Sequence, residues 1–572
     1  MLLDIEEESA DDARSILTLL CVANRPLKVE ELIDGIAVEL GDKPRFNRDS
    51  RLMSEDDIRH ICPGFIEADR QSGYNKTTVR IAHYSIQEYL ESDRILTSRA
   101  ARFGVKRVDA NTEVASICLT YLMDGGLCEE AINYHLDLHT KYPFAEYAAH
   151  NWPDHYHAGN GLDPRLHRLT LGLFCSDPSG HGRSAFSSWV NLTGWYRALP
   201  YGFAFRISPF CFAAMLGLDP AVRAIVEDSA SGPRGKGYLE WAMMAAAVYG
   251  RATTVQLLLD HGADIRFATS RGTALNYALR TELNNIMETL FIGADLVRHR
   301  PGLASGKDEV VRLLLGRGAD IDLGKDETPL ETACCSGRAD NVAFLLNRGA
   351  DVEKGGGFRR LLECSVINSH GYTAVVELLL SRGADVNVGA YRTPLEVAAS
   401  GIHGRMVTLL LDRGADVHGG KEMTPLEAAL SNGREGMAKI LLDRGADPNL
   451  GLKMRPLEVA ARWGAMPGVA EVIDRLIDKG ADVNGGQEMT PLETAATHGH
   501  VHLAKLLLDR GADINGGIKM TPWQTAKRTG HQELAQLLVD RGAHVREDSA
   551  TSPSEVEETR KEEKEGENAV DE

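Results

Sequence analysis

Cysteine is scarce in this chain and follows no recognisable pattern. Its 572 residues include 9 Cys, and no two of them are spaced C-x-x-C, so neither a disulfide framework nor a zinc knuckle is indicated. Long apolar runs are also missing, because the longest strongly apolar stretch, Trp241 to Tyr249, is far too short to cross a bilayer. The N-terminus, MLLDIEEESADD, is acidic where a secretory leader is basic. We therefore expect a soluble cytoplasmic protein, with a nuclear location left open.

The motifs of nucleotide and metal chemistry are missing too. A phosphate-binding loop needs G-x-x-x-x-G-K-[ST], and the nearest strings, Gly235-Lys236-Gly237 and Gly306-Lys307-Asp308, lack its spacing and its hydroxyl. His135 and His139 lie four residues apart, as helical metal ligands do, but no H-E-x-x-H frame accompanies them. Packing or surface histidines are the favoured interpretation. We expect no catalytic residue, no cofactor, no metal and hence no enzyme.

Positive charge is in deficit. Lys and Arg number 63 against 82 Asp and Glu, a net charge of −19, which disfavours nucleic acids and anionic membranes as main partners because both are polyanions. Residues 546–572 contribute 11 acidic and 4 basic groups with almost no apolar residue. This composition predicts a disordered acidic tail.

Glycine, by contrast, is abundant and periodic in one half of the chain. Residues 262–545 hold 36 of the 56 Gly. A Gly-Ala-Asp triplet recurs there, most often every 31 residues, and a fixed step of this size is the signature of a solenoid. The triplets begin at Gly262, Gly293, Gly318, Gly349, Gly383, Gly414, Gly445, Gly480 and Gly511.

A second motif follows most triplets after about ten residues. It reads Thr-Pro-Leu-Glu at Thr328, Thr393, Thr424 and Thr490, with variants at Arg455 and Thr521. The pattern predicts a helix start, in which Thr caps the free amides, Pro occupies the first helical position and Glu bonds back to the cap. An apolar run ending in Asp-Arg-Gly predicts a second helix, with Gly free to adopt the left-handed conformation. Each unit is therefore a helix pair that needs stacked neighbours.

These two motifs in phase resemble the ankyrin repeat, and the resemblance covers roughly residues 205–545. It implies a mostly α protein with an ankyrin-repeat solenoid of about ten repeats. The stretch between Asp295 and Asp320 lacks a regular inner helix and is counted as a fragment. The resemblance also implies that the array binds a protein ligand through its finger tips and inner helices.

One departure from the family concerns the residue after Thr-Pro-Leu. The family usually has His where this chain has Glu, as at Glu331, Glu363, Glu396, Glu427, Glu458 and Glu493. A ladder of catalytic carboxylates is one interpretation. A helix-capping role explains the same residues without chemistry and is favoured.

The finger tips between the two motifs are the candidate partner-binding sites. Met occupies the same tip position in four successive repeats and would form an apolar stripe, a surface type suited to adaptable binding. The alternative, which we favour, is that these Met side chains fold back and pack between fingers. The candidate residues are Lys325, Glu327, Tyr391, Arg392, Lys421, Met423, Lys453, Met454, Gln487, Met489, Lys519 and Met520.

The N-terminal part has a different texture. Helical spacing at residues 13–23 and 29–40, followed by a turn and a strand-like segment at 79–85, predicts a winged helix. Residues 1–104 carry 14 Lys and Arg against 20 Asp and Glu, so DNA binding is disfavoured.

Short matches in this part resemble the winged-helix and helical region that follows the NTPase of fungal NACHT- and STAND-type signalling proteins. They are Arg25-Pro26-Leu27, Cys62 to Ile66, Val79 to Leu90, Ala115 to Leu122 and Tyr142 to Trp152. The resemblance implies that the wing packs against the rest of the chain. We expect a winged-helix-like domain over 1–104, a helical connector over 105–204, the ankyrin array over 205–545 and an acidic tail over 546–572.

The leading hypothesis is a non-enzymatic scaffold for protein binding, placed by the resemblance in fungal recognition or signalling. The alternative is the C-terminal part of a nucleotide-regulated NACHT/STAND receptor whose NTPase is missing from this chain.

Overall fold

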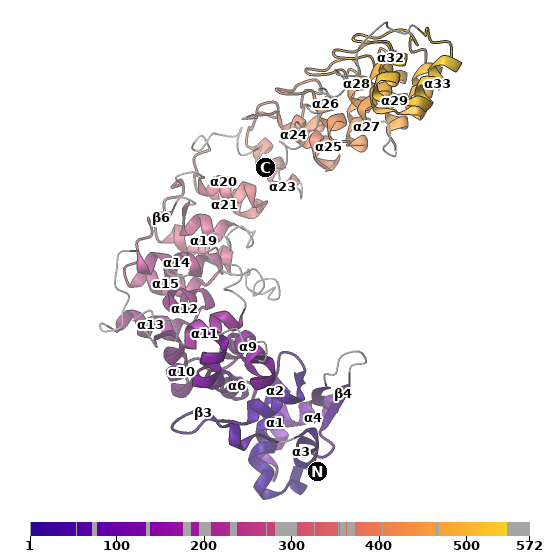
Figure 1. Ribbon diagram of the computed structural model, residues 1–572. Helices are drawn as coiled ribbons and strands as arrows, with labels where there is room; N and C mark the ends of the chain where they lie inside the picture. The colour runs from indigo at the N-terminus through magenta and orange to yellow at the C-terminus, as the bar shows by residue number, and fades with distance from the viewer. Residues whose placement is uncertain are drawn as a thin grey trace. The chain divides into compact units, whose positions relative to one another are not determined.

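The computed structural model shows a helical protein whose described residues fall into two compact units, 1–351 and 352–572 (Figure 1). The described residues are 2–52, 54–70, 77–132, 138–175, 185–193, 208–228, 237–269, 272–280, 306–324, 327–352, 354, 362, 372–389, 391–402, 404–463 and 468–545. No helix within these ranges is both long and apolar enough to traverse a bilayer.

The first unit begins with a small helical domain that carries a three-stranded antiparallel sheet. The strand order is β1-β5-β4, with Leu27 opposite Val79 and Ile66 opposite Ile81. Strands β4 and β5 form the wing expected from the sequence. The elements are η1 (Leu2–Asp4), η2 (Glu7–Ser9), α1 (Ala10–Val22), β1 (Leu27–Lys28), α2 (Val29–Ile36), β2 (Val38–Glu39), β3 (Arg45–Phe46), η3 (Arg48–Ser50), α3 (Glu55–Ile61), β4 (Ile66–Arg70), β5 (Thr77–Ile81), α4 (Tyr84–Glu91), α5 (Asp93–Leu96) and η4 (Ala101–Phe103).

The second helix is shorter than the spacing of apolar residues predicts. It was expected to run to Leu40, but it ends at Ile36, and Val38 pairs with Phe46 in the β2–β3 hairpin. The β-branched Val38 fits an apolar helix position and an apolar strand position equally well. Its pairing with Phe46 across the hairpin therefore determines that it is in a strand.

The domain is fixed to the helices that follow it through a buried carboxylate. Asp34 on α2 is almost fully buried, and it accepts a hydrogen bond from the Tyr121 hydroxyl. It also forms an ion pair with Arg51, whose Nη2 lies 2.5 Å from the carboxylate. Burial raises the pKa of the Asp34 carboxyl, and the two donors oppose that effect. The winged-helix part therefore packs intramolecularly, as the resemblance implies.

The next helices form an aromatic core that continues into the first repeats. Trp189 makes edge-to-face contacts with both Trp152 and Phe212 at centroid distances of 5.8 Å, and its indole Nε1 donates to Ala149 O at 2.9 Å. These rings join helices α9, α11 and α12 through a large apolar contact. The helices are α6 (Arg107–Leu122), α7 (Gly125–Ile132), α8 (Leu138–Lys141), α9 (Ala145–Ala158), α10 (Pro164–Cys175) and α11 (Ala185–Leu192).

Stacked helix pairs complete the first unit. Inner helices α12, α14, α16 and α20 pack in succession, and α13, α15 and α19 stack beside them. Their bounds are α12 (Pro209–Leu216), α13 (Asp219–Glu227), α14 (Tyr238–Val248), α15 (Ala252–Asp260), β6 (Ala268–Thr269), β7 (Gly272–Thr273), α16 (Ala274–Leu279), α19 (Lys307–Gly316), α20 (Pro329–Cys335) and α21 (Ala339–Asn347).

The stacking partners explain the irregular stretch before Asp320. Helix α16 packs against α14, α20 and α19, and α19 packs against the outer helix α15. Helices α16 and α19 are therefore the inner and outer halves of one repeat, separated by residues 280–306. The expected fragment is the outer half of the repeat that begins at Thr273, and the triplet at Gly293 lies outside the described residues.

The second unit is a regular series of helix pairs. Its elements are α23 (Thr373–Ser381), α24 (Pro394–Ser400), α25 (Gly404–Asp412), α26 (Pro425–Ser431), α27 (Glu435–Asp443), α28 (Pro456–Arg462), α29 (Val469–Asp478), α30 (Pro491–His498), α31 (Val501–Asp509), α32 (Pro522–Thr529) and α33 (Gln532–Asp540).

The predicted helix ends are confirmed. The capping boxes form at Thr328, Thr393, Thr424, Thr490 and Thr521. At the far end of a pair, Gly445 has φ +90° and the next amide, Ala446 N, donates to Leu441 O at 2.9 Å. Only Gly adopts this left-handed turn without strain, which is why the triplet begins with Gly.

Candidate protein-interaction surface

The glutamates of the capping boxes also hold the next finger. Glu427 is 1% exposed, and its Oε2 accepts from its own cap, Thr424 N, at 3.3 Å. The same carboxylate accepts from three successive backbone amides one repeat later: Leu452 N at 2.9 Å, Lys453 N at 3.0 Å and Met454 N at 2.8 Å. Convergent N–H groups of this kind compensate a buried negative charge without a cation.

The same arrangement recurs along the second unit. Glu458 accepts from the amides of 487–489, and Glu493 accepts from those of 518–520. Glu396 accepts from Lys421 N and Met423 N. The capping role expected from the sequence is correct for Glu331, Glu396, Glu427 and Glu493, but it is incomplete. Glu458 forms no capping box with Arg455, and Glu363 lies outside the described residues. The missed signal was that each Glu recurs 25 to 31 residues before the tip whose amides it binds.

The finger tips of the second unit carry exposed apolar and cationic side chains. Tyr391 is 82% exposed, Leu452 51% and Ile518 52%. Among the candidate residues, Lys421, Lys453, Gln487 and Lys519 are exposed and Arg392 is half-buried. Leu452 and Ile518 were not among the candidates, although they stand beside them at the tips.

Neighbouring fingers also touch through side chains. Lys421 Nζ donates to Gly389 O of the preceding finger at 2.7 Å, and Gln487 Nε2 donates to Gly451 O at 3.1 Å. These bonds reinforce the row of fingers from outside, while the glutamates hold it from within.

The four tip methionines are half-buried rather than exposed. Their backbone amides donate to the buried glutamates. In addition, Met489 Sδ accepts from Thr497 Oγ1 of its own inner helix at 3.7 Å. The side chain of Met489 thus folds back onto the repeat. The other three half-buried tip methionines are Met423, Met454 and Met520. This geometry favours the packing interpretation over a fully exposed stripe.

Two candidates belong to the first unit. Glu327 is half-buried, and its Oε2 accepts a hydrogen bond from Arg280 Nη2 at 2.9 Å. Its carboxylate is therefore paired within the repeat array. Lys325 lies outside the described residues.

The outer helices are linked by a ladder of exposed ion pairs. The Arg of three Asp-Arg-Gly motifs reaches an Asp one repeat earlier: Arg444 to Asp412 and Arg541 to Asp509 are both 2.8 Å, and Arg510 to Asp478 is 2.9 Å. Surface pairs of this kind contribute little free energy each. They engage charges of the outer face with one another.

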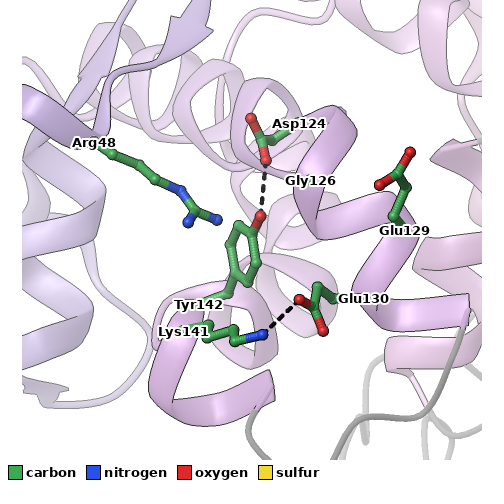
Figure 2. A pocket seen from close by; sticks show the side chains of 7 residues that line it. All are labelled: Arg48, Asp124, Gly126, Glu129, Glu130, Lys141 and Tyr142. Atoms are coloured by element: carbon green, nitrogen blue, oxygen red, sulfur yellow. Dashed lines mark hydrogen bonds and ion pairs between the residues drawn. The ribbon is translucent and has the colours of Figure 1, made fainter.

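A polar pocket of about 470 Å³ lies in the first unit, between η3 and helices α7 and α8 (Figure 2). Its charged lining is largely engaged internally: Lys141 Nζ pairs with Glu130 Oε1 at 2.6 Å, and the Tyr142 hydroxyl donates to Asp124 Oδ1 at 3.3 Å. The Arg48 guanidinium lies 4.3 Å from the centre of the Tyr142 ring. These contacts fasten the winged-helix part to the helices behind it, and they indicate no particular ligand.

The histidines near the predicted pair are bound by protein groups. His155 is fully buried, with Nδ1 2.8 Å from Asn111 Oδ1 and Nε2 2.9 Å from the Tyr147 hydroxyl. Because an amide oxygen only accepts, Nδ1 carries the proton and Tyr147 donates to Nε2. His139 is exposed, and His135 lies outside the described residues. Among the described residues, no group of three His, Cys, Asp or Glu side chains is placed to hold a metal.

Comparison with known protein families agrees with this architecture. A model described as the winged helix domain of GPI inositol-deacylase matches residues 3–106, and a model of three ankyrin repeats matches 361–451 and 457–549. This chain carries ankyrin repeats and an N-terminal winged-helix domain. The ankyrin helix pairs are the stacked pairs of Figure 1, and the winged helix is the domain built on β1, β4 and β5.

Individual relatives share only part of this ankyrin protein. It is 35% identical over 286 residues to Azaphilone pigments biosynthesis cluster protein L of Monascus ruber, a match that covers 46% of this chain. The chain spans 58% of that relative's length. The crystal structure of the human ASB11 ankyrin repeat domain is 26% identical, with a TM-score of 0.32, and the match covers 38% of this chain and all of that chain.

Proposed function

We propose that this protein is a non-enzymatic scaffold that binds a protein partner through the ankyrin fingers of its second unit. The observation that carries the proposal is the buried glutamate ladder, which binds the finger backbones at 452–454 and 518–520 while Leu452 and Ile518 stay exposed at the tips. Tyr391 adds another exposed side chain at a finger tip. Rigid loops with exposed apolar side chains lose little conformational entropy on binding. We also propose a winged-helix-like domain over 1–104, a helical connector over 105–204, the ankyrin array over 205–545 and an acidic tail over 546–572. We propose a cytoplasmic location for the protein.

We place this scaffold in fungal NACHT/STAND-like recognition or signalling. The match of the winged-helix model to residues 3–106 supports this placement. The second candidate, supported by the same match, is that the sequence is the C-terminal part of a nucleotide-regulated NACHT/STAND receptor. A longer transcript encoding a phosphate-loop motif in the same reading frame would favour that candidate.

Affinity capture with the full chain tests the scaffold proposal. The variant Tyr391→Ser/Leu452→Ser/Ile518→Ser removes the exposed apolar tips without touching the glutamates. The control, Val108→Ser/Leu162→Ser/Val539→Ser, removes exposed apolar side chains elsewhere. We expect the tip variant to lose at least one protein that the parent and the control retain. Identical protein sets for all three chains would contradict the proposal.

A further inference from the structure

The finger face of the second unit is oppositely charged to the rest of that unit. We define the finger face as tip residues 391–392, 421–423, 452–454, 487–489 and 518–520, together with the inner-helix residue seven positions after each capping residue. We propose that this face recognises an extended, acidic segment of a partner protein that carries apolar side chains. The inference rests on the proposed scaffold function and names the chemistry of its partner.

Contacts show that tips and inner-helix ends form one surface. Arg462, seven positions after Arg455, places its Nη2 3.4 Å from Glu488 Oε2 at the tip of the next finger. Thr497, at the same position one repeat later, bonds Met489 of its own tip. Arg462 and Thr497 therefore belong to the same surface as the tips.

The charges of this surface are mostly positive. It carries two carboxylates, Glu422 and Glu488, and the second is paired with Arg462. All other charged residues between 372 and 545 comprise 13 cations and 19 carboxylates. The six cations of the finger face are Arg392, Lys421, Lys453, Arg462, Lys519 and Arg528.

Apolar side chains alternate with these cations. Tyr391 precedes Arg392, Leu452 precedes Lys453, and Ile518 precedes Lys519, so each of these three fingers offers one apolar and one cationic group. A protein segment with alternating acidic and apolar residues matches this pattern. Because the pairs lie on every second finger of the row, a segment that reaches several of them must be extended.

A nucleic acid is the less favoured polyanion. The carboxylate of Glu422 is exposed among the cations, and the whole chain has a net charge of −19, which repels a long polyanion beyond the face itself. The aliphatic tips Leu452 and Ile518 also suit protein side chains better than bases, which stack on aromatic rings.

Selection from a random-peptide display library against the full chain tests this inference without assuming a ligand. We expect the selected peptides to be enriched in Asp and Glu combined with aromatic or aliphatic residues. We also expect the affinity of a selected peptide to fall as NaCl rises from about 50 to about 500 mM, because exposed charges are screened.

Two matched variants assign the binding to the finger face. Lys421→Glu/Lys453→Glu/Lys519→Glu should weaken a selected acidic peptide by about tenfold or more. Arg405→Glu/Lys479→Glu/Lys505→Glu changes the net charge equally on the outer helices and should leave the affinity within about twofold. Equal melting temperatures of the two variants would show that both remain folded.

Several outcomes would overturn the inference. Selected peptides without acidic bias that still require Tyr391, Leu452 and Ile518 would refute acidic specificity and leave the scaffold function standing. A selection that yields no peptide would count against both proposals. Tighter binding of a single-stranded oligonucleotide than of any selected peptide would assign the face to nucleic acid. A rise of about tenfold in peptide affinity in a chain ending at Val545 would assign it to the chain's own acidic residues 546–572.

Discussion

At the residue scale, the feature that most distinguishes this array is a buried glutamate in each regular repeat of the second unit. A carboxylate buried without partners is strongly destabilising. Here each Glu accepts from the backbone of the following finger, so its charge is compensated by oriented amides rather than by a cation. The last described repeat has Gln524 at this position, and no described finger follows it.

The variant Glu427→Gln tests this role. The replacement NH2 group cannot accept, and it would face the amides of 452–454, so we expect a loss of about 3 kcal/mol in the free energy of unfolding. Urea unfolding measures the loss, and hydrogen exchange should accelerate at those three amides. Glu422→Gln, on the exposed tip, is the matched control and should change stability by less than about 0.5 kcal/mol. Equal effects of the two variants would contradict the role.

At the element scale, single hydrogen-bonded groups lock helices together. His155 on α9 connects Asn111 on α6 with Tyr147, and the Tyr147 hydroxyl also accepts from Asn24 N at 3.2 Å, just after α1. This network joins the winged helix to the helices that follow it. It requires a neutral imidazole, because Nε2 accepts a hydrogen bond from the Tyr147 hydroxyl.

Acid should weaken this junction. Burial lowers the pKa of His155 to about 4 from an unfolded value near 6.5. Because the folded-state pKa is the lower one, the neutral ring's contribution is complete above pH 6.5 and is lost as pH falls toward 4. At pH 5 the loss is about 2 kcal/mol. NMR titration of the His155 ring should give a pKa near 4. A value near 6.5 would contradict the buried network.

At the scale of the whole molecule, the total charge conceals a local reversal. The net charge of −19 disfavours polyanions as partners, yet the finger face presents six cations and two carboxylates. The winged helix shows no such reversal on its third helix. Helix α3 begins with Glu55, Asp56 and Asp57, and it lies where a DNA-binding winged helix presents basic residues to the groove.

We therefore expect the full chain not to bind duplex DNA. Fluorescence anisotropy with a labelled duplex at about 0.1 M NaCl should show binding weaker than about 10⁻⁵ M, the range of non-specific contacts. Glu55→Lys/Asp56→Lys, which reverses the charge of α3, is the positive control and should bind more tightly. Binding of the parent chain in the nanomolar range would contradict this prediction.

Much of the fold could be predicted because its signals are local. Thr424, Pro425 and Glu427 specify a helix start within four residues, and Gly445 specifies a helix end by its backbone freedom alone. The site was less accessible to the same reasoning. Tyr391 and the tip lysines could be predicted as finger-tip residues because they lie between the Gly-Ala-Asp and Thr-Pro-Leu-Glu motifs. The burial of the methionines and the contact of Arg462 with Glu488 depend on neighbouring repeats.

The sequence by itself determined the repeat unit, the helix ends and the presence of a winged helix, because each depends on capping, turn chemistry and periodicity within a short window. Only the tertiary structure decided which elements pair over a distance. It showed that α16 completes its repeat with α19 across residues 280–306, and that each buried glutamate binds the following finger. It also placed Arg462 of an inner helix against Glu488 at the tip of the next finger. Stacking creates these relations, since residues 25 to 31 positions apart become neighbours only when one repeat packs on the next.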